Sequence, residues 1–338
     1  SALLDWYADN KRLLPWRDPL GRTTNPYFVW ISEIMLQQTT VPTVKSYFLD
    51  FTSRWPNIEQ LAAASIDDVF HAWQGLGYYS RARNLHRCAK IIAHEYSGAF
   101  PSDEASLLML PGIGPYTAAA IRSIAFNLPS TVVDGNIERI IARLFSIETL
   151  LPVAKKEIHE YALRLRSEQY PSNYAQALMD LGSSICTPRD PKCAICPIQT
   201  FCTAKDNRPE QYPRRQPKRA KPTRFGTFYY VLDKKGRVLL EKRQEKNALF
   251  SGMMLFPSVG WDRDLEDPVQ RLSLKVDKHS TIKVKHVFTH FTLIADVKKA
   301  RTSYKKGTWV APSELSQYAL PSLMKKIIQV ASALEAVE

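Results

Sequence analysis

A short basic segment, residues 205–224, divides the chain into two stretches of different character. It contains eight Lys and Arg, two Asp and Glu, four prolines and few apolar side chains. Such a composition favours an extended, exposed linker, because it supplies too little apolar surface for a core. The length of 338 residues also fits two domains at about 150 residues each. We therefore expect one domain over residues 1–204 and another over residues 225–338.

The two stretches show different hydrophobic periodicities. Apolar residues recur every three to four positions around residues 28–38, 85–96 and 137–145, which is typical of helices with one buried face. After the linker, residues 225–232 and 237–243 flank the turn sequence Asp233–Gly236 and predict a β-hairpin. Further strand candidates lie within 281–297, and helical patterns lie within 266–274 and 322–334. The expected fold is an all-α domain followed by an α+β domain.

The formal net charge of +13 is distributed unevenly. Residues 1–204 carry 19 basic and 19 acidic side chains, whereas residues 225–338 carry 19 and 12. A basic run can bind nucleic acid or a membrane surface, or it can simply be solvated. If the partner is DNA, the linker and second domain should hold the duplex electrostatically and weaken with salt.

Neither a membrane span nor a disulfide scaffold is expected. The longest apolar-looking stretch, residues 107–126, is interrupted by prolines, glycines and Arg122, whereas a span needs about 20 nearly uninterrupted apolar residues. The N-terminal residues lack the basic-then-apolar order of a secretory signal. Four of the five cysteines are clustered, which points to a metal centre in a reducing, cytoplasmic setting.

The four clustered cysteines are Cys186, Cys193, Cys196 and Cys202, with the spacing C-x6-C-x2-C-x5-C. Four thiolates are the normal ligand set of an iron–sulfur cluster. Zinc also binds four thiolates, but usually through two separated C-x2-C pairs, and this run contains one. The fifth, Cys88, lies on an apolar helix face and is expected in the core.

A glycine- and proline-rich connection joins two predicted helices within about residues 107–126. Gly112 and Gly114 allow backbone N–H groups to approach an anion, and the following helix N-terminus adds a favourable dipole, so the loop suits a DNA phosphate. A sharp turn between two helices would use similar residues. Asp134 lies 20 residues after Gly114 and just before a helix predicted from about Ile137. It could be an N-cap or a reactive carboxylate.

These motifs, together with Leu14–Arg17, Trp30–Thr39 and Gly75–Arg81, closely resemble the MutY-type adenine DNA glycosylases of the helix-hairpin-helix superfamily. The resemblance covers essentially the whole chain. It implies a monomeric bacterial enzyme, associated with the nucleoid through its function. Its substrate would be double-stranded DNA in which adenine lies opposite 8-oxoguanine or guanine, and adenine would be removed by a retaining hydrolysis that leaves an abasic site. It also implies a 4Fe-4S cluster on the four cysteines and allows a monovalent cation at the hairpin.

The resemblance assigns catalytic roles to four residues. Glu33 would protonate N7 of adenine and then activate water, and Asp134 would stabilise or capture the positive anomeric carbon. Tyr116 and Asn136 would hydrogen-bond the sugar, Asp134 and the water. Subfamilies with strong lyase activity carry a lysine where Tyr116 stands, so a monofunctional enzyme is expected. Although a helix glutamate is usually a solvated residue, the apolar neighbours of Glu33 should raise its pKa.

Further residues are assigned to the adenine pocket and to the DNA around 8-oxoguanine. The pocket set is Trp16, Arg17, Leu36 and Gln176, the last often a glutamate in the family. The DNA-contacting set is Gln38, Thr39, Leu76, Tyr78, Gly112, Gly114, Phe288, Thr289 and His290. By residue type alone, the Tyr78–Tyr79 pair could instead pack in a core, and His290 could be a packed strand histidine.

The second domain resembles the Nudix-like domain of the same family. Nudix hydrolases hold their metals with G-x5-E-x7-R-E-U-x-E-E-x-G, and residues 225–338 contain no adjacent pair of glutamates. We therefore expect a base-recognition domain rather than a pyrophosphatase. Two alternatives remain: an endonuclease III-like mismatch or oxidised-pyrimidine glycosylase, which would lack this domain, and a non-catalytic DNA-damage-binding protein, which the presence of both Glu33 and Asp134 disfavours.

Overall fold

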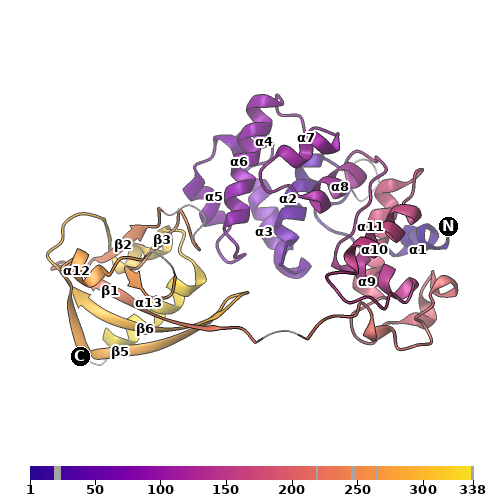
Figure 1. Ribbon diagram of the computed structural model, residues 1–338. Helices are drawn as coiled ribbons and strands as arrows, with labels where there is room; N and C mark the ends of the chain where they lie inside the picture. The colour runs from indigo at the N-terminus through magenta and orange to yellow at the C-terminus, as the bar shows by residue number, and fades with distance from the viewer. Residues whose placement is uncertain (19–23, 218–219, 245–248, 263–264, 336–338) are drawn as a thin grey trace. The chain divides into compact units, whose positions relative to one another are not determined.

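The computed structural model describes residues 1–18, 24–217, 220–244, 249–262 and 265–335 (Figure 1). The chain forms two compact units. The first consists of Ser1–Ala63 and Asn84–Lys218, and the second of Ala64–Arg83 and Arg219–Glu338. A segment of the helical half of the chain, residues 64–83, therefore belongs to the same unit as the C-terminal sheet.

The N-terminal half of the chain is helical, as predicted. Its α-helices are α1 (Ala2–Asn10), α2 (Pro26–Leu36), α3 (Val41–Arg54), α4 (Ile58–Ala63), α5 (Ile66–Ala72), α6 (Ser80–Glu95), α7 (Glu104–Met109), α8 (Pro115–Ile124), α9 (Gly135–Leu144), α10 (Lys155–Leu165) and α11 (Pro171–Ser184). Short 3₁₀ helices follow at Cys193–Ile195, Gln199–Phe201 and Pro209–Gln211.

Helices α2 and α11 form much of the interior of the first unit. Helix α2 starts with Asn25 as N-cap and Pro26 in the first turn, two common start signals. It is apolar on nearly all sides, so it is buried on all sides. Helix α11 packs against α1, α8 and α9, and α2 packs against α3 and α8. Ser32 and Glu33 on α2 and Gln176 and Asp180 on α11 are therefore polar residues that face the interior.

The expectation of an extended, exposed linker was wrong around Tyr212, although Glu210, Gln211 and Arg215 are exposed. Pro209–Gln211 form a 3₁₀ turn, and Tyr212 is only 3% exposed. The carbonyl oxygens of Pro209 and Tyr212 accept hydrogen bonds from the buried Arg143 guanidinium, which fixes this stretch against α9. Leu151 and Arg215 form an isolated β-bridge. Lys218 and Arg219 of the predicted linker lie outside the described residues.

The second unit contains a mixed sheet with the strand order β3-β2-β1-β6-β5. Its strands are β1 (Thr223–Leu232), β2 (Val238–Lys242), β3 (Met254–Leu255), β4 (Ser258–Val259), β5 (Lys275–Val287), β6 (Thr292–Arg301) and β7 (Thr308–Val310). Strands β1 and β2 pair antiparallel around the predicted turn, which confirms the hairpin, whereas β1 and β6 run parallel (Figure 1).

Helices α12 (Pro268–Arg271) and α13 (Ser322–Glu335) and the 3₁₀ helix Pro312–Gln317 accompany the sheet in the C-terminal part of the chain, which confirms the α+β class. Helix α12 is shorter than the predicted 266–274, and α13 matches its prediction. Apolar residues of α13, including Leu323, Met324 and Ile327, are fully buried with those of β1, β2 and β6. Among the described residues, no helix is long and apolar enough to cross a membrane.

Candidate active site

Glu33 is a buried carboxyl group on α2, only 6% exposed. Its Oε2 accepts a hydrogen bond of 2.6 Å from the Tyr116 hydroxyl on α8. Burial raises the pKa of Glu33 to about 7, although the Tyr116 hydrogen bond opposes this shift. The nearby Asp134 charge raises the Glu33 pKa further and the Arg17 charge lowers it. The raised pKa expected from the apolar flanks is confirmed, and a substantial fraction of Glu33 is protonated at neutral pH.

Asp134 is held by hydrogen bonds at the start of α9. Its Oδ1 accepts from the backbone N–H groups of Asn136 and Ile137 at 2.9 and 2.7 Å, and its Oδ2 accepts from the Asn136 amide at 2.9 Å. Asp134 is therefore the N-cap, as one reading of the sequence predicted. An N-cap carboxylate can still take part in catalysis, because the same hydrogen bonds fix it in one orientation.

Asn136 is itself fixed from the opposite side. The Arg139 guanidinium donates to Asn136 Oδ1 at 3.0 Å and to the carbonyl oxygens of Cys186 and Gly182 at 2.7 and 2.5 Å. Gly182 allows α11 to approach closely, because a Cβ there would lie 2.5 Å from Asn136 Cβ. Sequence analysis did not identify Arg139 or Gly182.

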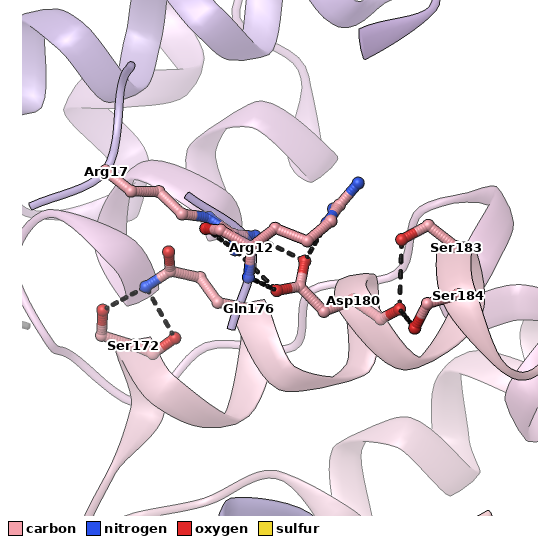
Figure 2. A network of polar contacts seen from close by, with 7 residues as sticks. All are labelled: Arg12, Arg17, Ser172, Gln176, Asp180, Ser183 and Ser184. Carbon is pink, nitrogen blue, oxygen red and sulfur yellow. Dashed lines mark hydrogen bonds and ion pairs between the residues drawn. The ribbon is translucent and has the colours of Figure 1, made fainter. Parts of the chain in front are cut away.

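The four predicted pocket residues line one cavity together with Glu33. This cavity lies between α2, α11 and the segment after α1, and its lining includes Trp16, Arg17, Leu36 and Gln176. The Gln176 amide nitrogen donates to the Ser172 backbone carbonyl and hydroxyl at 3.3 and 3.2 Å (Figure 2). Its carbonyl oxygen is thus the atom suited to accept a hydrogen bond from a ligand.

A buried carboxylate that sequence analysis missed organises the cavity wall. Asp180 is fully buried on α11, and its carboxylate binds both the Arg12 and Arg17 side chains (Figure 2). Asp180 stands four residues after Gln176, so both project from one face of the helix. An acidic residue within the apolar run 175–181 was the available signal, since charged residues are seldom fully buried unless paired.

The hairpin between α7 and α8 has the predicted form. Gly112 has a φ of 82°, which favours glycine, and a Cβ there would lie 2.9 Å from the Asn84 Cβ. The sharp turn between the two helices therefore requires a glycine at position 112. Gly114 is the N-cap of α8, so the first N–H groups of this helix follow directly after it.

Two predicted DNA-contacting residues have unusual backbone conformations. Gln38 and Tyr78 have φ values of 62° and 47°, and both side chains are exposed. Positive φ values are uncommon outside glycine and cluster at functional sites. Gln38 and the half-buried Thr39 follow α2 in the first unit, whereas Tyr78 belongs to the second unit.

The Tyr78 loop contacts the C-terminal part of its own unit. The Tyr78 hydroxyl and the Thr289 hydroxyl form a hydrogen bond. Tyr78 is 44% exposed, whereas Tyr79 is buried against Phe70, so the core-packing interpretation applies to the second tyrosine alone. Leu76 is buried and supports the loop from inside.

Residues 288–290 form an exposed turn between β5 and β6. Phe288 is half-buried and stacks on Phe291 with a centroid distance of 4.6 Å. Thr289 and His290 are exposed. His290 is therefore not a packed strand histidine.

The four cysteines lie half-buried in one loop after α11. Arg143 donates to Cys186 Sγ at 3.3 Å and to the Thr187 carbonyl at 2.8 Å. Burial raises the pKa of Cys196 to about 11, so bound metal would have to stabilise the thiolate form.

Four cysteine thiols in one loop can ligate an iron–sulfur cluster, in which each thiolate binds a different iron. Within the described ranges, no three Cys, His, Asp or Glu side chains are placed to hold one metal ion.

Comparisons with known proteins agree with this architecture. Residues 31–166 match the profile of the HhH-GPD superfamily base excision DNA repair protein, residues 186–202 the iron-sulfur binding domain of endonuclease III, and residues 227–330 the NUDIX domain. The chain is therefore a helix-hairpin-helix DNA glycosylase with an iron–sulfur domain and a Nudix-like domain.

Relatives over most of the chain define the family more closely. The adenine DNA glycosylase of Buchnera aphidicola subsp. Schizaphis graminum is 34% identical over 98% of this chain and 97% of that protein. The protein of the same name from Homo sapiens is 30% identical over 98% of this chain and 73% of its own. The chain belongs to the MutY-type adenine DNA glycosylase family.

A solved structure of a thermostable thymine-DNA glycosylase shares the helical fold. It is 30% identical, with a TM-score of 0.55, and covers 61% of this chain and 94% of its own. The similarity therefore leaves more than a third of this chain without a counterpart.

The close approach at Gly182 gives a testable prediction. Gly182→Ala would push Asn136 away from Asp134 through the 2.5 Å contact, and should slow single-turnover base excision by roughly tenfold or more. Asn173→Ala, at an exposed position on the same helix, is the control. A Gly182→Ala rate equal to that of the control would show that this contact does not position the site.

Proposed function

We propose that this enzyme removes adenine lying opposite 8-oxoguanine or guanine in duplex DNA by a retaining hydrolysis. The observation that carries the proposal is the buried Glu33, which hydrogen-bonds Tyr116 and lines the same cavity as Gln176. An acid with a pKa of about 7 is matched to proton transfer at neutral pH. Adenine offers N7 as a proton acceptor and its exocyclic amine as a donor.

The first chemical step is loss of the protonated base. Glu33 gives its proton to adenine N7, the C1′–N9 bond breaks with its electron pair going to adenine, and positive charge develops at C1′. Asp134, oriented by Asn136 and the α9 N-terminus, stabilises this charge and bonds to C1′. Ionised Glu33 then accepts a proton from water as the water oxygen replaces Asp134 at C1′, so the configuration is retained overall.

Tyr116 supports this chemistry without supplying an amine. Burial raises its pKa well above the usual value, so the hydroxyl stays protonated and donates to Glu33. A phenol at this position cannot form a Schiff base with the sugar, so a monofunctional glycosylase is favoured.

The cysteine loop supplies a site for a 4Fe-4S cluster. Cys186, Cys193, Cys196 and Cys202 would ligate it, and the bound cluster would order the loop that Arg139 and Arg143 contact. Hydrolysis needs no redox step from it. A monovalent cation at the hairpin, a monomeric state and a bacterial cytoplasmic, nucleoid-associated location complete the proposal.

The second unit would read the base opposite adenine. Tyr78 and Thr289 present a hydrogen-bonded pair of hydroxyls at an exposed surface, beside Phe288 and His290. Exposed hydroxyl, imidazole and aromatic groups can hydrogen-bond and stack on an oxidised purine. We propose that residues 225–338, together with residues 64–83 of the same unit, form the recognition domain. The rest of residues 1–204 would form the catalytic domain, with residues 205–224 between the two in the chain.

The two alternative functions have less support. A mismatch glycosylase of the endonuclease III type has no use for the Nudix-like residues 227–330. A non-catalytic DNA-damage-binding protein has no need to bury Glu33 beside the Asp134 charge, which costs folding stability.

An assay on three duplexes tests the substrate assignment. The protein is incubated with duplexes carrying A opposite 8-oxoguanine, T opposite G, or an oxidised pyrimidine, followed by hot alkali. Strand breaks should appear at adenine alone, and Asp134→Asn should lower the rate by roughly 10²-fold or more while binding persists. Breaks at the mispaired thymine or at the oxidised pyrimidine instead would contradict the adenine assignment. Retained turnover in Asp134→Asn would refute the catalytic role of Asp134.

The raised pKa of Glu33 predicts the pH dependence. Because the protonated acid starts the reaction, single-turnover rates should fall as pH rises through about 7, and Glu33→Gln should lose roughly 10²- to 10⁴-fold. Glu157→Gln, on the first turn of α10, is the control. A constant rate across the neutral range would contradict the acid role.

The hydroxyl pair predicts the specificity. Tyr78→Phe and Thr289→Val should each reduce the preference for A:8-oxoguanine over A:guanine by roughly 2- to 10-fold, and the double variant should lose less than the product of the two effects. Thr281→Val, at an exposed position on β5, is the control. An unchanged preference in the double variant would show that other residues read 8-oxoguanine.

A further inference from the structure

Asp180 makes four hydrogen bonds to two arginines from the segment after α1. Its Oδ1 accepts from Arg12 Nε at 2.6 Å and Arg17 Nη2 at 2.9 Å. Its Oδ2 accepts from the Arg12 backbone N–H at 2.9 Å and Arg17 Nη1 at 2.7 Å. Figure 2 shows both side chains converging on this one carboxylate. Arg17 is thereby bound in the two-pronged geometry that fixes both position and orientation of a guanidinium.

The two arginines and Asp180 differ in their relation to the cavity. Arg12, Arg17 and Gln176 line the cavity that holds Glu33, whereas Asp180 does not. The Asp180 side chain is 1% exposed, Arg17 is 10% exposed and Arg12 is 30% exposed. The carboxylate therefore acts on the cavity through the arginines that it holds and through its own charge.

We propose that Asp180 is a positioning residue for base removal, which holds the Arg12 and Arg17 guanidinium groups in the cavity wall and offsets part of their charge beside Glu33. This inference rests on the proposed function, because it assigns Asp180 a task in the same adenine pocket. A salt bridge that merely joined α11 to the N-terminal segment would not need two arginines on one carboxylate at the cavity.

The charges around each carboxyl group give the direction of the effect. Burial opposes ionisation of Asp180, but the hydrogen bonds and charges of Arg17 and Arg12 outweigh it and hold its pKa below the usual value. Among the described residues, Tyr7 also lies near Asp180, and burial raises its pKa, so the phenol stays neutral. Asp5, Lys11, Asp18 and Lys45 line a neighbouring cavity with Arg12 and Arg17, and their two acidic and two basic groups leave its balance unchanged. Asp180, Arg12 and Arg17 therefore carry a net charge of about +1.

Of these three charged groups, Arg17 is the one whose charge lowers the Glu33 pKa, and Arg12 lines the same cavity. Tyr116 and Asp134 also influence the Glu33 pKa. Removing the Asp180 charge would leave about +2 in the wall, which favours ionised Glu33 and lowers its pKa. Removing the Arg12 charge instead would leave Asp180 and Arg17 with a net charge of about zero. The Glu33 pKa would then rise.

The experiment compares pH profiles of single-turnover adenine excision from an A:8-oxoguanine duplex, using the full chain with its cluster. Asp180→Asn keeps one acceptor oxygen for the arginines but removes the charge. The basic limb of its pH–rate profile, where the rate falls as pH rises, should move to lower pH by about half a unit or more. The rate near pH 8 should therefore fall roughly threefold or more. Asp206→Asn removes an exposed acid of the same unit, with 86% of its side chain exposed, and should leave the limb in place.

Arg12→Gln provides an independent variant in case Asp180→Asn does not fold. Its basic limb should move to higher pH, opposite to that of Asp180→Asn. If Asp180 had a merely structural role, both variants would contain less active enzyme and the basic limb would stay at the same pH. That result would overturn the inference. An inactive wild-type enzyme on this duplex would instead refute the proposed function, so the two failures are distinguishable.

Discussion

The binding of two arginines by the buried Asp180 carboxylate connects the N-terminal segment to α11, and the arrangement of the active-site cavity depends on that connection. Arg12 and Arg17 come from a stretch without helix or strand, so hydrogen bonds to α11 fix their positions. Helix α11 also carries Gln176 one turn before Asp180, and Gly182 where α9 approaches closely. Helix α11 thereby positions both the cavity wall and Asn136, which hydrogen-bonds the Asp134 carboxylate.

The chemistry depends on two carboxyl groups in different environments. Glu33 is buried on an apolar helix, and burial raises its pKa toward neutrality. Asp134 is only partly buried and accepts hydrogen bonds from three N–H groups at a helix N-terminus, a setting that suits a carboxylate anion. The pair can therefore supply a proton donor and an anion at the same pH, as removal of a base from a sugar requires.

The sequence predicted the helical half, the β1–β2 hairpin and the burial effect on Glu33, because each follows from local periodicity, turn chemistry or apolar neighbours. The residues that line the cavity came from the resemblance to the glycosylase family. The sequence did not predict the contacts of Asp180, Arg139 and Arg143, since these join segments distant in the chain. Nor did it predict that residues 64–83 belong to the C-terminal unit or that Tyr212 is buried. Linker composition indicated exposure, but tertiary packing against α9 prevailed.

The state of the Glu33 carboxyl group is the central claim, and infrared difference spectroscopy tests it most directly. The spectrum of the wild-type protein minus that of Glu33→Gln, recorded as a function of pH, isolates the C=O stretch of one protonated carboxyl group. We predict that this band is present at pH 6 and loses half its intensity near pH 7. A band that is lost near pH 4.5, the ordinary value for glutamate, would contradict this claim.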